Sequence, residues 1–378
     1  MPSLYVHIPF CQRKCVYCDF YSIETVSLMD SFLDALDTEI ALAAPAGEGV
    51  SFDTLFFGGG TPSLLAPREL ERVMRSLRRA FAIGDDAEIT LETNPGTVTP
   101  GKLREYRALG VNRLSIGIQS FDENELRFLG RIHDAGEAAR CVGLAREAGY
   151  RNVSVDLIYS LPGQTAGEWE RTLSKALALR PDHVSAYSLI VEDGTPLARM
   201  VSAKLVSPNP VEAEASLYER TMDVMERAGF EHYEVSNYAR PGFRSLHNSA
   251  YWSHADYLGF GPSAHSFWRV GDGDRRVRWA NVSSLGRYCD SLRKREPPVA
   301  MREEVTRAQL CNERIFLGLR SSGLDIRSLG EEFPLPAETV AIAGALVEEG
   351  AAVLEGGTLR LTARGYMLCD EIAARMMV

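Results

Sequence analysis

The sequence lacks a long hydrophobic run, because no apolar segment approaches the roughly 18 residues that a membrane-spanning helix requires. Met1–Phe10 shows no basic stretch followed by an apolar core, so we expect no secretory signal peptide. Basic residues are also few, with 41 Lys and Arg against 51 Asp and Glu and a net charge of −10. These absences argue against a membrane span and against general nucleic-acid binding, and they make a cytoplasmic protein the expectation.

The chain also lacks the cysteine pattern of a disulfide framework. It has seven cysteines, an odd number, in a chain for which we expect no secretion. Four are scattered along the sequence, at Cys141, Cys289, Cys311 and Cys369. We interpret these four as buried thiols. The other three, Cys11, Cys15 and Cys18, fall close together and need a functional explanation.

Short runs of β-branched and apolar residues alternate with amphipathic segments of helical period over the first half of the chain. The predicted strands are Leu4–Ile8, Thr54–Phe57, Glu88–Glu92, Arg113–Ile118, Asn152–Ile158 and His183–Leu189. The predicted helices lie near Leu28–Ala43, Pro67–Ala82, Pro100–Leu109, Ala135–Ala148 and Ala166–Leu179. Such β-α repeats imply a parallel sheet. Since a closed barrel needs eight units, we predict an α/β fold with a partial, six-stranded (β/α) barrel.

The alternation of strand-like and helical segments stops beyond residue 190. We expect a helix at Val211–Gly229, an irregular aromatic-rich stretch at Tyr233–Trp279, and a linker at Asn281–Ala300. The pattern therefore divides the chain into a barrel over residues 1–235 and a separate segment over residues 236–300.

Residues 301–378 predict a small α+β, winged-helix-like domain. Helical patterns return near Glu303, and Ala351–Leu354 and Thr358–Leu361 flank a Gly-Gly turn that is typical of a hairpin. This region has 8 arginines, no lysine and 12 acidic residues. That balance favours packing or partner contact over DNA binding.

Cys11, Cys15 and Cys18 directly follow the first predicted strand. Three thiolates can hold three irons of a [4Fe–4S] cluster, which leaves the fourth iron for the amino and carboxylate groups of S-adenosylmethionine (SAM). An electron from the cluster can then cleave SAM, a reaction that belongs to the cofactor. The alternative is a structural zinc site with His7 as the fourth ligand, although the second cysteine pair usual for zinc is missing.

Ligand-type residues also follow the later strands. Gly58-Gly59-Gly60-Thr61-Pro62 ends the second strand, and it is either a tight turn or a loop whose free amides contact a ligand. It lacks the lysine of a phosphate-binding loop. Glu92, Gln119 and Asp156 stand near the carboxyl ends of three further strands. Each could be structural alone, but their recurrence predicts one active face.

The segment Tyr5-Val-His-Ile-Pro-Phe-Cys11-Gln-Arg-Lys-Cys15-Val-Tyr17-Cys18 closely resembles the radical SAM proteins related to oxygen-independent coproporphyrinogen III oxidase. The resemblance implies that the glycine run lines the SAM amino group and that Arg131 contacts a SAM carboxylate. It further implies that Tyr5 and Tyr17 flank the cofactor. The remaining SAM contacts, to its ribose or methionine part, would come from Glu92, Gln119 and Asp156. With Gly59, Gly60 and Thr61, these residues form the predicted SAM site.

Two features separate the chain from the oxidases of this family. Phe20 stands where they carry a further cysteine, and only ten residues precede Cys11 where they carry a long extension. His247-Asn248-Ser249-Ala250-Tyr251-Trp252 instead resembles the His-Asn-x-x-Tyr-Trp motif of the HemW-type haem chaperones.

This resemblance implies that His247, Asn248, Tyr251 and Trp252 belong to a haem site. Histidine is a common axial ligand of haem iron, and tyrosine can also serve, so Tyr251, His254 or His265 would be the next candidates after His247. Arginines can meet haem propionates, and three candidates are Arg275, Arg276 and Arg278. The alternative is that His247 is structural and the aromatic residues are core.

The sequence thus predicts a cytoplasmic haem chaperone that holds haem beside a SAM-liganded cluster and passes haem to an unidentified acceptor protein. An electron donor and a peripheral membrane contact during haem delivery are further partners that this function allows, whereas no nucleic acid is expected. The alternative function is that of a radical SAM coproporphyrinogen III oxidase, so enzymatic activity stays open at this stage.

Overall fold

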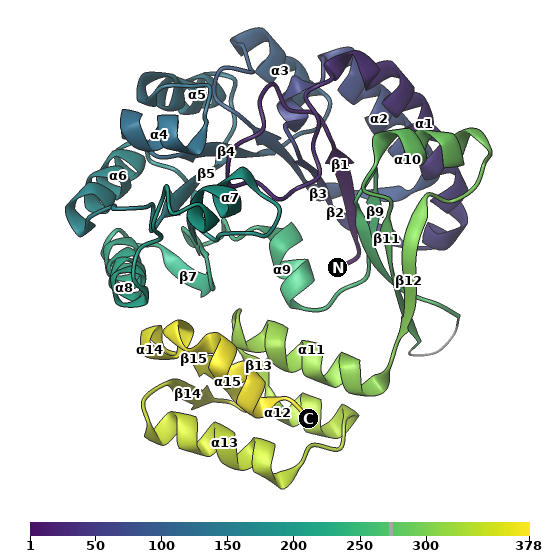
Figure 1. The fold of residues 1–378 in the computed structure, drawn as a ribbon. Coiled ribbons are helices and arrows are strands. Elements are labelled where there is room, and N and C mark those ends of the chain that lie inside the picture. The colour runs from purple at the N-terminus through teal and green to yellow at the C-terminus, as the bar shows by residue number, and fades with distance from the viewer. Residues whose placement is uncertain (272–274) are drawn as a thin grey trace.

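The computed structural model describes residues 1–271 and 275–378 (Figure 1). Its main sheet has twelve strands in the order β12-β11-β10-β9-β1-β2-β3-β4-β5-β6-β8-β7. The six strands that come first in the sequence are parallel and lie side by side in chain order. They are β1 (Ser3–Ile8), β2 (Ser51–Gly59), β3 (Ala82–Thr93), β4 (Arg113–Gln119), β5 (Asn152–Tyr159) and β6 (His183–Ser188). The predicted partial barrel is therefore confirmed.

Helices form the outer layer of this barrel, as Figure 1 shows for the arc that surrounds β1–β6. They are α1 (Met29–Ala43), α2 (Pro67–Ala80), α3 (Pro100–Ala108), α4 (Glu123–Leu129), α5 (Ala135–Glu147), α6 (Ala166–Ala178) and α8 (Val211–Arg227). The short helix α7 (Pro196–Ser202) lies inside the arc. The sequence pattern missed α4, which begins after Asp122; the Asp122 side chain accepts hydrogen bonds from the amides of Asn124 and Glu125.

The strands alternate between two environments. On β4, Leu114, Ile116 and Ile118 are fully buried in the hydrophobic core. Their neighbours point to the other face of the sheet, towards the barrel interior, because successive side chains of a strand alternate in direction. These inward residues are Arg113, Ser115, Gly117 and Gln119. The barrel interior is therefore polar, and it is the place for a site.

The stretch Tyr233–Trp279 is not irregular, as the sequence pattern had indicated. It contains β7 (Glu231–Glu234), β8 (Asn237–Ala239), α9 (Leu246–Trp252), β9 (Tyr257–Phe260), β10 (His265–Arg269) and the start of β11 (Arg276–Asn281). β8 pairs with β6 and β9 pairs with β1, so this stretch extends the sheet at both edges. Between them, α9 crosses the inside of the arc (Figure 1). Strands of 3 to 5 residues are too short to show a clear alternation.

The segment expected to be a linker, residues 281–300, has secondary structure of its own. It contains α10 (Leu285–Arg293) and leads into β12 (Val299–Val305), which closes one edge of the main sheet. The Tyr288 hydroxyl donates a 2.6 Å hydrogen bond to the buried Glu39 carboxylate of α1. The segment is thus packed against the barrel.

The C-terminal region has the predicted α+β composition, with an antiparallel sheet in the order β13-β15-β14. Its elements are α11 (Arg307–Leu319), β13 (Leu324–Asp325), α12 (Ile326–Glu332), α13 (Ala337–Glu348), β14 (Ala352–Glu355), β15 (Thr358–Leu361), α14 (Ala363–Met367) and α15 (Cys369–Met376). Gly356 and Gly357 both have positive φ at the hairpin turn, as the sequence predicts.

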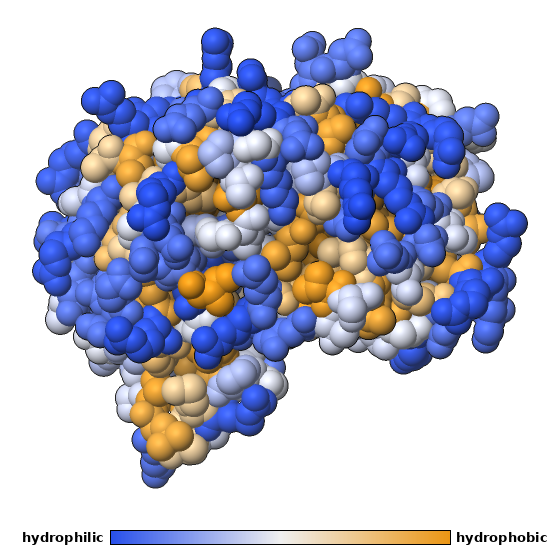
Figure 2. All heavy atoms as spheres, turned by 90° about the horizontal axis from the view of Figure 1, so that it is seen from above, coloured by the Kyte–Doolittle hydropathy of each residue, from blue (hydrophilic) through white to orange (hydrophobic). Residues whose placement is uncertain are grey.

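Within the described residues, no helix combines the length and apolar character needed to cross a membrane. On the face shown in Figure 2, hydrophilic residues cover most of the surface, and hydrophobic residues gather near the centre and on the projection at the lower left.

Candidate cofactor site

A cavity of about 520 Å³ extends from the loops at the carboxyl ends of the barrel strands down to α9. It is lined by every residue of the predicted cluster and SAM sites: Tyr5, Cys11, Cys15, Tyr17, Cys18, Gly59, Gly60, Thr61, Glu92, Gln119, Arg131 and Asp156. Of the predicted haem motif it also contacts His247, Asn248 and Tyr251, but not Trp252. The fold therefore brings residues from six strands and one distant helix to a single space.

The three clustered cysteines stand at the upper end of this cavity, in the loop after β1. The Cys11 amide donates to the Ile23 carbonyl at 2.9 Å, and the Leu197 amide donates to the Val16 carbonyl at 2.9 Å. Cys11 is buried, whereas Cys15 and Cys18 are half-buried. The loop is therefore held at several points while its thiols face the cavity.

The geometry does not support the zinc alternative. Within residues 1–271 and 275–378, no three His, Cys, Asp or Glu side chains lie close enough together to share a single metal ion. His7 instead places its Nε2 atom 2.8 Å from the Tyr21 carbonyl oxygen and its Nδ1 atom 3.2 Å from the Tyr5 hydroxyl. Its two ring nitrogens are thus both used within the protein.

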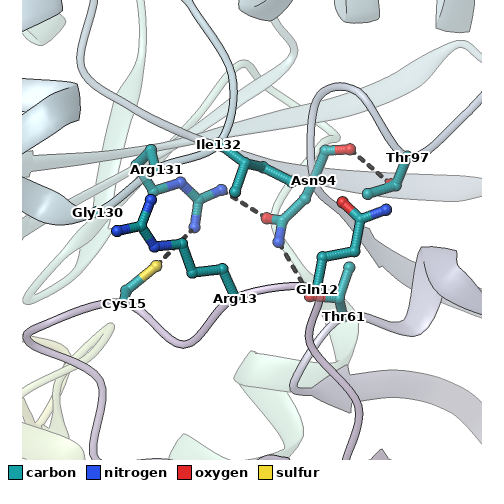
Figure 3. Close-up of a pocket in the computed structure, with 9 residues that line it drawn as sticks. All are labelled: Gln12, Arg13, Cys15, Thr61, Asn94, Thr97, Gly130, Arg131 and Ile132. Atoms are coloured by element: carbon teal, nitrogen blue, oxygen red, sulfur yellow. Dashed lines mark hydrogen bonds between the residues drawn. The ribbon is translucent and has the colours of Figure 1, made fainter. Parts of the chain in front are cut away.

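A hydrogen-bonded chain of side chains connects two of the thiols, and Figure 3 shows it from Cys15 as far as Thr61. Arg131 donates through Nη1 to Cys15 Sγ at 3.5 Å and through Nη2 to Asn94 Oδ1 at 2.6 Å. Asn94 Nδ2 donates to Thr61 Oγ1 at 3.0 Å, and the Thr61 hydroxyl donates to Cys11 Sγ at 3.6 Å. Arg131 and Thr61 therefore contact the thiols directly, and Asn94 joins them.

The glycine run has a different role from the free amides that the sequence indicated. The Gly59 amide donates to Glu92 Oε2 at 3.2 Å, and the Gly60 amide donates to the Ile8 carbonyl at 2.9 Å. A Cβ atom on Gly60 would lie 2.6 Å from the Phe10 carbonyl oxygen. Gly60 therefore allows the end of β2 to approach the backbone directly before Cys11.

Two buried carboxyl groups form the middle of the cavity wall. Burial raises the pKa of Glu92 to about 8, and the neighbouring Asp156 carboxylate acts in the same direction. Burial also raises the pKa of Asp156, although its oxygens accept hydrogen bonds from Ser115 at 2.9 and 3.1 Å. Both carboxyl groups are therefore less readily ionised than an exposed carboxyl group, and both face the cavity.

Sequence reasoning missed Asn94 and Arg113 as cavity residues. Arg113 is only 2% exposed, and its Nε lies 3.9 Å from Glu88 Oε2. A signal for it existed, because Arg113 shares the period-two face of β4 with Gln119. Asn94 lies two residues after Glu92, just beyond the end of β3. This spacing places it on the same face as Glu92 and could have indicated a cavity residue.

His247 forms part of the cavity floor and is only 1% exposed. Its Nδ1 lies 2.8 Å from Thr54 Oγ1, its Nε2 lies 3.0 Å from the Tyr251 hydroxyl, and its ring stacks on Phe56. The His247 amide donates to the Glu88 carboxylate at 3.1 Å. Burial, helped by the charge of Arg113, lowers the pKa of His247 to about 3. Iron ligation would require one of these ring contacts to be replaced.

The other residues that were considered for haem lie outside the cavity lining. Burial raises the pKa of Glu234 to about 7, and a hydrogen bond from Trp252 is one of the contacts that oppose this rise. His254 Nε2 pairs with Glu313 at 2.9 Å. His265 and the three arginines on or beside β11 do not line the cavity either. Arg275 pairs with Glu304, Arg276 with Asp256, and Arg278 with both Glu303 and Glu313. These ion pairs would have to be exchanged for the arginines to bind haem propionates, so that role stays a prediction.

The mouth of the cavity carries exposed apolar side chains, a feature that the sequence did not reveal. Phe20 is 61% exposed, Ile190 is 63% exposed and Tyr187 is 43% exposed, and all three line the cavity. Arg13 and Lys14 stand at the same mouth, together with the acidic Asp19 and Glu192. A group of large apolar side chains beside a cavity is typical of a binding surface.

Comparison with known proteins agrees with this geometry. The profile of the radical SAM superfamily matches residues 5–176, and the profile of the HemN C-terminal domain matches residues 305–368. The chain is 35% identical to "Heme chaperone HemW" of Bacillus subtilis over 98% of each chain. It is 36% identical to the protein of the same name from Mycobacterium tuberculosis, covering 99% of this chain and 94% of that protein.

A solved structure shares the whole architecture. Coproporphyrinogen III oxidase (HemN) from Escherichia coli, described as a radical SAM enzyme, superposes with a TM-score of 0.85 at 26% identity. The match covers 100% of this chain and 90% of that one. The similarity therefore includes both the barrel and the C-terminal region.

Proposed function

Because the chain belongs to the radical SAM superfamily, on its HemW-type branch, we propose that it is a haem chaperone. It binds haem and a SAM-liganded [4Fe–4S] cluster, and it passes haem to an acceptor protein. The name "heme chaperone" of relatives that match nearly the full chain supports this function. The acceptor, an electron donor, a peripheral membrane contact and a cytoplasmic location remain predictions from the sequence.

The residues of the cavity fit the cluster and SAM. Three thiols face one space, and two of them receive hydrogen bonds from Thr61 and Arg131. Arg131 Nε is buried and has no partner among the described residues, as expected of a guanidinium that a SAM carboxylate would complete. Cys11, Cys15 and Cys18 would hold the cluster, whose chemistry when SAM is bound is electron transfer to SAM.

The observation that carries the haem assignment is the apolar mouth of the cavity. Haem is a flat, largely apolar molecule with two carboxylates, so it suits a surface of apolar side chains with a cation beside it. Phe20 and Ile190 supply the apolar surface, and Arg13 and Lys14 are cations in the same part of the lining. We therefore place haem at the mouth, with His247 beneath it as part of the floor.

The alternative function is that of an oxidase, which the similarity to the Escherichia coli enzyme favours. Phe20 argues against it, because the oxidases carry a further cysteine at this position and here an apolar ring faces the cavity mouth.

Anaerobic titration with hemin tests the proposed function. Protein reconstituted with iron and sulfide should give a saturable Soret band. Addition of a haem-free haemoprotein should then transfer that band to the acceptor. Absence of a saturable band would contradict the haem assignment, whereas a saturable band without transfer would limit the function to haem binding.

A further inference from the structure

The side chain of Asn94 lies between two groups that each contact a cluster thiol (Figure 3). Its Oδ1 atom accepts from Arg131 Nη2 at 2.6 Å. A guanidinium can only donate, so the carboxamide must turn its oxygen to Arg131 and its NH₂ group to Thr61. The orientation of the amide is therefore fixed by its partners.

This orientation decides what the Thr61 hydroxyl does. Thr61 Oγ1 accepts from Asn94 Nδ2 at 3.0 Å, so its own proton is available for another acceptor. That acceptor is Cys11 Sγ, at 3.6 Å. On the other side, Asn94 Oδ1 accepts from Nη2 of the Arg131 guanidinium. The Nη1 atom of the same guanidinium donates to Cys15 Sγ at 3.5 Å. One amide thus directs two hydrogen bonds onto two thiols.

The position of Asn94 is itself fixed from both sides. Its backbone amide donates to Ser63 Oγ at 3.2 Å, and its carbonyl accepts from Thr97 Oγ1 at 2.6 Å. Arg131 Nη2 also donates to the Gly117 carbonyl at 2.6 Å. The side chain and the backbone of Asn94 are therefore both held by hydrogen bonds to neighbouring elements.

We propose that Asn94 is a positioning residue that sets the reduction potential of the cluster by holding Thr61 and Arg131 in place as donors to the Cys11 and Cys15 thiolates. Hydrogen bonds to cluster sulfurs stabilise the added negative charge of the reduced cluster and thereby raise its potential. The cluster's readiness to give an electron to SAM then depends on a residue that reaches the two thiolates through Thr61 and Arg131. The inference rests on the cluster of the proposed function but not on haem binding.

The test is a redox titration of cluster-loaded protein, followed by the electron paramagnetic resonance signal of the reduced cluster. Asn94→Ala should keep the iron and sulfide content of the wild type and shift the potential to a more negative value. Thr61→Val, which removes only the donor to Cys11, should shift it in the same direction by less. The shift of the double variant should be smaller than the sum of the single shifts, because Asn94 acts partly through Thr61.

Asn112→Ala is the matched control. Asn112 is also an asparagine with a structural role, because it accepts from the Ile89 amide at 2.9 Å and donates to the Ala87 carbonyl at 2.8 Å, but it does not line the cavity. Its variant should keep the wild-type potential.

The outcomes separate the inference from the proposed function. A wild-type protein that takes up no cluster would contradict both. An unchanged potential in fully loaded Asn94→Ala protein would overturn the inference alone. If Asn94→Ala fails to load, Thr61→Val decides, and an unchanged potential in that variant would equally overturn it.

Discussion

The upper end of the cavity and its floor are both built from motifs that stand out in the sequence. Their side chains differ in whether the polar atoms already have partners within the protein. At the upper end, Cys15 and Cys18 are half-buried, and Arg131 keeps a buried Nε without a partner among the described residues. At the floor, both ring nitrogens of His247 already contact Thr54 and Tyr251. A ligand-type residue can bind a cofactor only where its donor atom is still available, so the two motifs have different roles.

The largest expected effect is at the upper end. Cys15→Ala should abolish the broad iron–sulfur absorbance of anaerobically reconstituted protein, because a cluster thiolate is lost. Cys289→Ala is the matched control, since Cys289 is also half-buried but lies on α10, and it should load normally. Full iron content in Cys15→Ala protein would contradict the assignment of Cys15 as a cluster ligand.

The floor should respond to substitution mainly through stability. His247→Ala removes a fully packed ring and leaves the buried Thr54 hydroxyl without its partner. We expect a loss of about 3 kcal/mol in unfolding free energy, with the cluster absorbance retained. Thermal or urea unfolding measures the loss. The opposite pattern, unchanged stability with a lost Soret band, would show that His247 is an iron ligand.

The barrel and the cysteine loop could be predicted because each depends on a local pattern. The period-two strands, the helical segments and the spacing of Cys11, Cys15 and Cys18 are all visible within a few residues. The sequence could not show that the ring nitrogens of His247 already have partners, because one partner, Thr54, lies 193 residues away. Asn94 was missed for the same reason, since it meets Thr61 33 residues away and Arg131 37 residues away.

A smaller effect should appear in the pH dependence of stability. Burial lowers the pKa of His247 to about 3, whereas an unfolded histidine titrates near 6.5. Below that value the unfolded chain binds a proton that the folded chain does not, so stability falls as the pH drops. His247→Gln should therefore reduce the slope of unfolding free energy against pH by about 1.4 kcal/mol per unit between about pH 5.5 and 4. Parallel slopes in the two proteins would contradict a neutral, buried His247.

The smallest effect is expected at the mouth. Phe20→Ser and Ile190→Ser each remove part of the proposed apolar surface for haem, and each should weaken hemin binding about five-fold, or about 1 kcal/mol. Leu205→Ser is the control, because Leu205 is 75% exposed but does not line the cavity. Equal hemin affinity in all three variants and the wild type would show that haem does not bind at the mouth.

The proposed function requires the protein to bind haem and to leave coproporphyrinogen III unconverted. The most direct measurement is an anaerobic assay of cluster-loaded protein with coproporphyrinogen III, SAM and a reductant, run on a preparation that gives a saturable Soret band with hemin. The haem-chaperone function predicts haem binding and no protoporphyrinogen. Protoporphyrinogen formed over several turnovers by that preparation would contradict it and establish the oxidase function.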